Sequence, residues 1–254
     1  MAAGTERVER VPTAADPPTD RPAEPRVTIV IPARNEEAYI EAALDSVARQ
    51  TVPLDRLQVV VVVNGAIDRT AEVVRAARER LPRLEIRMVD DPLPGVARAK
   101  NIGARLANGD LLVFLDADSR MAPDLVERII AASMAGYRAG SVTIAADDGD
   151  ILDRGFYRLI EFGKRLFGIH ANMLYCDRAA FESVGGFDES LYQAEDRDLL
   201  VRLARAGLRL GRITESVIYT SPRRLHEGPL RVGLLKVFGR WTLGHLGIWR
   251  RRPY

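Results

Sequence analysis

The sequence predicts a single α/β domain, a doubly wound and largely parallel sheet with helices on both faces. Three observations predict this class: short apolar runs rich in valine and isoleucine, longer segments of helical period between them, and starts of successive runs that lie 26 to 31 residues apart. This spacing is about the length of one βαβ unit. Runs that are apolar throughout are typical of strands covered on both faces.

The first half of the chain carries the regular alternation. Its predicted strands are Val27–Pro32, Gln58–Asn64, Leu84–Asp90 and Leu111–Asp116. Its predicted helices are Glu36–Gln50, Asp68–Leu81 and Val96–Asn108. In the first helix Ile40, Leu44 and Val47 recur at the i, i+4, i+7 spacing of a buried face. Each strand is therefore expected to be followed by a crossover helix.

The order and spacing of predicted elements change in the second half of the chain, and we do not expect this half to repeat the first. A helix, a strand and a second helix are predicted, then a less regular stretch through Gly185 and Gly186, and finally a helix that Gly207 ends as a C-cap, followed by two short strands. The predicted helices are Pro123–Gly136, Ile151–Phe167 and Glu195–Ala206, and the predicted strands are Ser141–Ala146, Leu208–Ile213 and Val217–Thr220.

The two ends of the chain differ from this folded domain, which we place at residues 26–228. Residues 1–25 are rich in Pro, Ala, Asp, Glu and Arg and poor in large apolar side chains, so we expect a disordered leader. Residues 229–254 are expected to form an amphipathic, basic helix.

Composition excludes several classes of function. With 37 basic and 35 acidic side chains the formal net charge is +2, which gives no overall attraction to nucleic acid. Cys176 is the single cysteine, which excludes an internal disulfide or a cysteine-cluster metal site. The sequence has no secretory signal and no apolar stretch of membrane-spanning length, so we expect a cytoplasmic protein.

A pair of carboxylates follows the fourth predicted strand. Asp116 and Asp118 emerge directly after the apolar run Leu111–Leu115, at the sheet edge where open α/β folds bind ligands. Residues i and i+2 of an extended segment point to the same side, and a hard divalent cation prefers oxygen ligands such as carboxylates and phosphates. The pattern predicts a metal site that the phosphates of a nucleotide complete; the alternative is a turn in which both carboxylates bond to loop amides.

Two other turns place polar side chains at the same predicted edge. The first strand runs into Pro32-Ala33-Arg34-Asn35-Glu36-Glu37, and the second runs into Asn64-Gly65-Ala66-Ile67-Asp68. Adjacent strands can place such groups around a nucleoside. The alternative is that Asn35 and Asp68 cap helices and that Gly65 supplies a turn conformation.

The order of these motifs resembles family 2 glycosyltransferases of the GT-A fold. The resemblance spans about Val27 to Thr220 and is carried by I-P-A-R-N-E-E, V-V-N-G-A-I-D-R-T, G-V-A-R-A-K-N-I-G-A, L-D-A-D, V-G-G-F-D-E and A-E-D-R-D-L-L-V-R-L. It implies transfer of a sugar from a nucleotide diphosphate donor to an acceptor hydroxyl, on a glycan or a lipid-linked molecule.

The resemblance also implies roles for single residues. It places Lys100 near the donor, and it assigns Mg²⁺ or Mn²⁺ to Asp116 and Asp118 at the diphosphate. Many relatives carry an acidic residue that recognises the nucleobase where this chain has Asn64, and a serine where it has Ala66. Because an amide both donates and accepts hydrogen bonds, both UDP and GDP stay open as the nucleotide. The residues implied to line the nucleoside pocket are Pro32, Arg34, Glu36, Asn64 and Asp68.

Glu195 and Asp196 begin a predicted helix. Acids in a first helical turn complement the helix dipole without any further role. The resemblance instead points to Asp196 as the general base and leaves Glu195 to position the acceptor. Displacement at the anomeric carbon needs one base, whereas a metal-stabilised diphosphate needs no separate acid. One base and one metal predict inversion at that carbon.

His226 follows the last predicted strand, where some GT-A enzymes place a third metal ligand; the alternative is an ordinary loop histidine. Beyond it, apolar residues from Leu230 to Trp249 form a stripe flanked by basic residues, with Arg250-Arg251-Arg252 after it. This stripe either packs on the enzyme or lies on an anionic membrane, which would make the protein peripheral on the inner face.

Two rival functions share parts of this pattern. A nucleotidyltransferase that makes a sugar nucleotide would need a glycine-rich, basic loop after the first strand, whereas Pro32–Glu36 contains no glycine and is followed by a second acid. A non-catalytic protein that binds nucleotide sugars would keep the pocket but need no base.

Overall fold

The computed structural model describes residues 9–11, 25–147, 150–167, 174–191, 193–226 and 239. Within them the elements are β1 (Glu9–Arg10), β2 (Val27–Ala33), α1 (Ile40–Ala48), β3 (Leu57–Asn64), α2 (Thr70–Arg80), β4 (Glu85–Asp91), α3 (Val96–Arg105), β5 (Leu111–Phe114), β6 (Ser119–Met121), α4 (Leu125–Met134), β7 (Ala139–Ala146), α5 (Ile151–Phe167), β8 (Leu174–Asp177), α6 (Arg178–Ser183), α7 (Glu195–Arg205), β9 (Leu210–Thr220) and a 3₁₀ turn, η2 (Pro222–Leu225).

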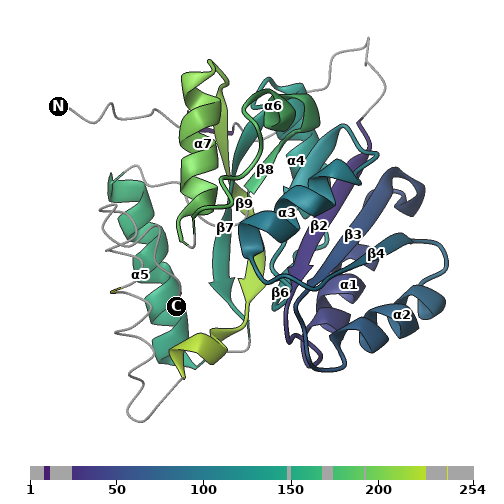
Figure 1. Cartoon of the computed structure of the whole chain (residues 1–254). Helices are drawn as coiled ribbons and strands as arrows, with labels where there is room; N and C mark the ends of the chain where they lie inside the picture. Colours follow the sequence, from purple (N-terminus) through teal and green to yellow (C-terminus); the bar gives the residue numbers. More distant parts are fainter. Residues whose placement is uncertain are drawn as a thin grey trace.

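One mixed sheet organises these elements (Figure 1). Its order is β1-β9-β7-β8-β5-β2-β3-β4, with β6 added on β9. All neighbours on the main path run parallel except β8, which is antiparallel to both β5 and β7. The carboxyl ends of β2, β3, β5 and β7 therefore meet at one edge, which we call the carboxyl edge.

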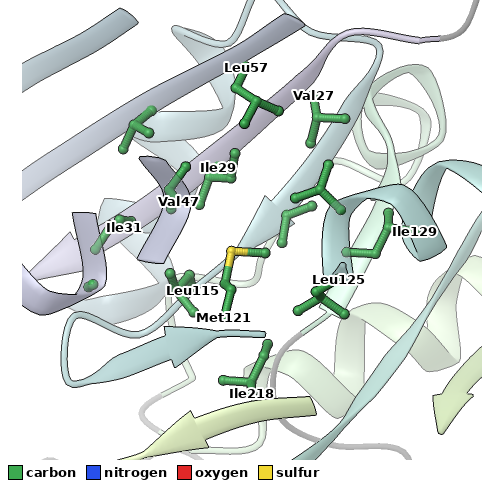
Figure 2. Packing of buried hydrophobic residues seen from close by; sticks show 14 of the residues in the cluster. Val27, Ile29, Ile31, Val47, Leu57, Leu115, Met121, Leu125, Ile129 and Ile218 are labelled. Carbon is green, nitrogen blue, oxygen red and sulfur yellow. The ribbon is translucent and has the colours of Figure 1, made fainter. Parts of the chain in front are cut away.

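Alternation along β2 divides the core between the two faces of the sheet. Val27, Ile29 and Ile31 pack with side chains of α1, α2 and α4, and Figure 2 shows part of this cluster around Val47, Met121, Leu125 and Ile129. Val30 points to the other face and packs with residues of α3, α6 and α7. On that face Gly103 of α3 lies so close to β2 that an added Cβ would meet Val30 Cγ1 at 2.2 Å.

Most of the predicted elements are confirmed with small shifts at their ends, and Gly207 ends α7 with a φ of +87° as a C-cap glycine should. The two predicted terminal strands are wrong as separate elements: β9 is one strand, with an irregular pairing to β7 between Ile213 and Val217. The less regular stretch contains β8 and α6. Β6, which directly follows the Asp116–Asp118 pair, was not predicted.

The predicted disordered leader is wrong for residues 9–11. Glu9 and Arg10 form β1, which pairs parallel with Gly211 and Arg212 of β9. The Glu9 carboxylate accepts hydrogen bonds from Arg209 (2.7 Å) and Tyr137 (3.2 Å), and Val11 is buried. These charged partners order a segment that has little apolar surface of its own.

The predicted C-terminal helix, Pro229–Trp249, lies outside the described residues apart from Gly239. Among the described residues, no helix has both the length and the apolar character needed to cross a bilayer.

Candidate active site

The turns after β2 and β3 are joined to each other at the carboxyl edge. Asn35 has a φ of +56°, and its side-chain oxygen accepts a hydrogen bond from the Ile67 amide (2.9 Å). The Asp68 carboxylate accepts from the Glu37 amide (3.1 Å) and from the Thr70 amide (3.0 Å). Burial raises the pKa of Asp68, but these hydrogen bonds outweigh it and leave the pKa below its ordinary value. Asp68 therefore both caps α2 and fixes the loop after β2.

Asn64 is buried between two backbone segments. With its amide oriented to satisfy both neighbours, its nitrogen donates to the Ala33 carbonyl (3.1 Å) and its oxygen accepts from the Gly95 amide (3.2 Å). Asn64 thus holds the start of α3 against the end of β2. Pro32 is half-buried and Arg34 is exposed on the same loop, so the loop presents several of the predicted pocket residues at one edge.

Asp116 and Asp118 lie in the turn between β5 and β6. The Ser119 amide donates to the Asp116 carbonyl (3.0 Å), which tightens the turn, and the Asp118 carbonyl accepts from the Ser221 amide (3.0 Å) beyond β9. Asp116 is half-buried, and Asp118 is buried at 8% exposure. The pairing of β6 with β9 therefore fixes the position of the second carboxylate.

Arg223 joins this turn to the loop after β2. Its guanidinium lies 3.1 Å from the Asp118 carboxylate, forms a second ion pair with Glu36, and lies over the Tyr39 ring at 4.4 Å from the centroid. Burial lowers the pKa of Arg223, but the two carboxylates outweigh this and raise it. No role for Arg223 was predicted from the sequence, although its place just after the last predicted strand was an available signal.

A buried lysine holds the acidic start of α7. Lys100 Nζ lies 2.7 Å from Asp196 Oδ1, 3.0 Å from Glu195 Oε1 and 5.1 Å from the centroid of the Phe187 ring. The Lys100 side chain is 3% exposed. Lys100 was expected near the donor; the contacts that the structure gives it are with the predicted base and its neighbour.

Charge interactions link Lys100 and Asp196 to the Asp116–Asp118 turn. Burial lowers the pKa of Lys100, but the charges of Asp196, Glu195 and Asp116 outweigh it and raise the pKa above its ordinary value. Burial raises the pKa of Asp196 to about 6, with Lys100 opposing the rise and Glu195 and Asp116 adding to it. The charge of Asp116 acts on both groups, so the Asp116–Asp118 turn lies within electrostatic range of Asp196.

His226 meets a different partner. Its Nε2 lies 2.9 Å from a carboxylate oxygen of Asp153, a fully buried residue at the start of α5. Across the described ranges, no group of three or more His, Cys, Asp and Glu side chains is placed to hold a metal ion. The three predicted ligands are therefore not gathered together, and the role of His226 as a ligand stays a prediction.

Comparisons with known proteins decide the family. The profile described as "Glycosyl transferase family 2" matches residues 28–182, more than half of the chain. The chain belongs to this family. The expected family 2 glycosyltransferase domain is confirmed, and with it the expectation of an enzyme.

Relatives of this family 2 chain include the validoxylamine A glucosyltransferase of Streptomyces hygroscopicus subsp. jinggangensis, 40% identical over 108 residues, which are 42% of this chain and 25% of that enzyme. The chondroitin synthase of Pasteurella multocida is 30% identical over 192 residues, which are 72% of this chain and 19% of the synthase. The chain thus spans a quarter or less of the length of these two relatives.

Two solved structures share the fold of this glycosyltransferase. The mannosyltransferase PcManGT from Pyrobaculum calidifontis, in complex with GDP-Man and Mn²⁺, has a TM-score of 0.70 and 24% identity, covering 95% of this chain and 70% of that chain. S. aureus TarS in complex with UDP has a TM-score of 0.59 and 19% identity, covering 78% and 61%. The predicted GT-A fold is confirmed.

In this glycosyltransferase the residues present fit a divalent cation as partial ligands. Asp116 and Asp118 offer carboxylate oxygens, the donors that Mg²⁺ and Mn²⁺ prefer, but too few to complete a site. A cation there would depend on oxygens from the donor. Arg223 already forms an ion pair with Asp118, so a cation and Arg223 would share the Asp118 carboxylate.

Proposed function

We propose that this glycosyltransferase is an inverting, metal-dependent enzyme that moves a sugar from a UDP- or GDP-linked donor to an acceptor hydroxyl. One observation carries the proposal: Lys100 Nζ lies 2.7 Å from the Asp196 carboxylate, and the charge of Asp116, in the turn after β5, acts on both groups. A base and a diphosphate site that lie within electrostatic range of each other suit a single displacement.

Each residue then has a defined task. Asp196 accepts the proton of the acceptor hydroxyl as the acceptor oxygen bonds to the anomeric carbon. The bond from that carbon to the diphosphate breaks, and the electron pair leaves with the nucleoside diphosphate. A cation bound by Asp116 and Asp118 would supply positive charge to the departing diphosphate. Attack from the side opposite the leaving group inverts the anomeric carbon.

Lys100 and Glu195 support the base. Because Lys100 holds both carboxylates from one side, Asp196 presents a fixed oxygen to the acceptor. The loop from Pro32 to Glu36, with Asn64 and Asp68 behind it, forms the nucleoside side of the proposed site.

The choice between UDP and GDP rests on chemistry at this loop. PcManGT was solved with GDP-Man and TarS with UDP, so the fold accommodates both kinds of ligand. The nucleobase would meet the exposed side chain of Arg34 on this loop, because the amide of Asn64 is already engaged with the backbone.

The acceptor is a second part of the proposal. We propose a hydroxyl on a glycan or a lipid-linked molecule. The role of residues 229–254 at an anionic membrane stays a prediction.

Asp196→Asn tests the function. We expect donor binding to stay within about twofold while turnover falls about 100-fold or more, the usual range for a lost general base. Asp198→Asn is the matched control, because Asp198 lies on the same helix and pairs with Arg202 at 2.8 Å instead of Lys100. Equal turnover by the Asp196→Asn variant and the native chain would remove Asp196 from the reaction.

A further inference from the structure

Helix α5 leaves several large apolar side chains exposed, although Ile160 is buried and Tyr157 packs against the core. Ile151, Leu152, Leu159 and Phe162 point outward with exposures of 81, 60, 59 and 61%. The inward side includes charged residues, of which the structure buries Asp153, Glu161 and Lys164. A surface helix ordinarily buries its apolar stripe and exposes its charges, so the outward row, which we call the α5 apolar face, needs a partner. Figure 1 shows α5 at one flank of the molecule, beside β7.

Specific contacts fix this orientation. Asp153 contacts His226 at 2.9 Å, and Lys164 contacts Glu161 at 2.8 Å. Glu161 also pairs with Arg212 of β9 and accepts a hydrogen bond from the Ile144 amide of β7 (3.4 Å). Rotating α5 to bury its apolar face would break these buried ion pairs, which is strongly destabilising. The outward apolar face therefore belongs to the folded state.

Arginines lie on one side of this face. Arg154 and Arg158 are one turn apart on α5, and with Arg49 and Arg120 they line a cavity of about 780 Å³ between α5 and strands β6 and β7. The two acids that line the cavity are already engaged, Asp147 with Arg120 and Glu161 with Lys164 and Arg212. The lining of the cavity beside the α5 apolar face therefore carries more positive than negative charge.

We propose that the α5 apolar face binds an anionic lipid bilayer. Apolar side chains beside arginines suit the boundary between acyl chains and headgroups. Other occupants fit the charge less well: the segment 227–254 brings Arg231, Lys236 and Arg240 and the run 250–252, all cationic, and a second copy brings the same arginines. Anionic headgroups instead neutralise them.

The position of α5 gives this surface a use. The turn η2 connects it to the candidate active site, because Arg223 contacts Asp118 while His226, three residues later, contacts Asp153 of α5. A bilayer on α5 would bring lipid-borne acceptors to the carboxyl edge. Lipid binding itself does not depend on the proposed reaction and is measured without a donor, so its failure and the failure of the proposed function are distinguishable.

The test is vesicle co-sedimentation of the full chain. Native protein is compared with Leu159→Glu/Phe162→Glu and with Arg154→Glu/Arg158→Glu, on vesicles of phosphatidylcholine with phosphatidylglycerol and of phosphatidylcholine alone. We expect each double variant to reduce binding to the anionic vesicles about tenfold or more. Binding should also weaken between about 0.1 M and about 1 M salt, as the screening length falls from about 10 Å to about 3 Å.

Controls carry matched changes on other exposed helices. Met134→Glu on α4 adds a charge at an exposed apolar site, and Arg75→Glu/Arg78→Glu reverses two charges on α2. Both controls should bind as the native chain does, and melting curves should show all variants folded. If the Leu159→Glu/Phe162→Glu variant melts early, Leu152→Ser repeats the measurement at an outward position.

Three outcomes would overturn the proposal. The first is unchanged lipid binding by both α5 variants, or equal binding to neutral vesicles. The second is a change in tryptophan emission when Leu159→Glu/Phe162→Glu is compared with the native chain without lipid. Both tryptophans, Trp241 and Trp249, lie in the segment 227–254. Such a change would make that segment the occupant of the α5 apolar face. The third is a lipid-free dimer that this variant dissociates in sedimentation velocity, which would make a second copy the occupant.

Discussion

Replacing Lys100 with methionine should move the pH dependence of the reaction as well as weaken the fold. Methionine keeps most of the side-chain length but removes the ammonium group that lies 2.7 Å from Asp196 and 3.0 Å from Glu195. Two largely buried carboxylates then lose the ammonium group that holds them both, while the charge of Asp116 still acts on Asp196. The ionised form of Asp196 loses its main stabilising partner, so its pKa rises above about 6.

The size of the effect follows from the geometry. Two unit charges about 4 Å apart interact by about 4 kcal/mol at an effective dielectric constant near 20, and water that enters the vacated space screens part of the loss. A rise of about one to two pKa units corresponds to about 1.4 to 2.7 kcal/mol. Removing one partner of a buried ion pair also costs about 3 to 5 kcal/mol of folding free energy. Protonation of Asp196 relieves part of that cost, so we expect a loss near about 3 kcal/mol, or roughly 6 to 12 °C in Tm.

The assay is the pH profile of kcat/KM for turnover of the nucleotide sugar, which reports the ionisation of the free enzyme. A base is active when deprotonated, so native activity should fall as the pH drops through about 6, the pKa of Asp196. The falling limb should lie about one to two units higher in Lys100→Met and near its native position in Lys100→Arg, which keeps the charge. A Lys100→Met enzyme that loses stability while its limb stays in place would refute this reasoning and reduce Lys100 to a structural residue.

Two further predictions concern the metal and the sheet. Asp118→Ala should abolish the Mn²⁺-dependent rise in Tm that a nucleoside diphosphate produces, because the metal and nucleotide stabilise the folded state only if the Asp118 carboxylate binds the metal. A rise equal to that of the native chain would remove Asp118 from the metal site. Gly103→Ala should destabilise the protein by about 1 to 3 kcal/mol in urea unfolding, because its Cβ would meet Val30 Cγ1 at 2.2 Å; unchanged stability would mean that α3 moves away from β2 without cost.

The regular first half was predictable because local and global signals agree there. Strands such as β3 are apolar throughout and bounded by turn residues, so burial on both faces and strand length are both visible in the sequence. Elements stabilised by distant partners were not visible. Strand β1 is two charged residues held by Arg209 and Tyr137, and β8 is only four residues long.

The candidate site divides in the same way. Asp116, Asp118 and Asp196 could be predicted as candidate functional residues, because a carboxylate at a strand end or a helix start is recognisable from one short segment of sequence. The partners that fix them were not, since Lys100 and Arg223 meet their carboxylates across long sequence separations. A signal for Lys100 existed: it lies on the apolar face of α3 with Ala97 and Ala104, and a buried lysine needs an acid.

The same is true of α5. Its bounds were predicted correctly, since Ile151–Phe167 has a clear helical period. Which side faces the protein was not predictable from that period, because the inward charges find their partners on β9 and in the turn after it, at Arg212 and His226.

The long separations between paired residues also bear on the order in which the protein gains its chemistry during synthesis. Glu36 meets Arg223 187 residues later, and Lys100 meets Asp196 96 residues later. A nascent chain that has emerged only as far as β5 carries the loops after β2 and β3 but neither Asp196, the proposed base, nor Arg223. Contacts between distant segments form late in folding. An unfinished chain would therefore not consume nucleotide sugar. Cleavage of the chain between the two halves is expected to abolish turnover although the loops after β2 and β3 stay intact.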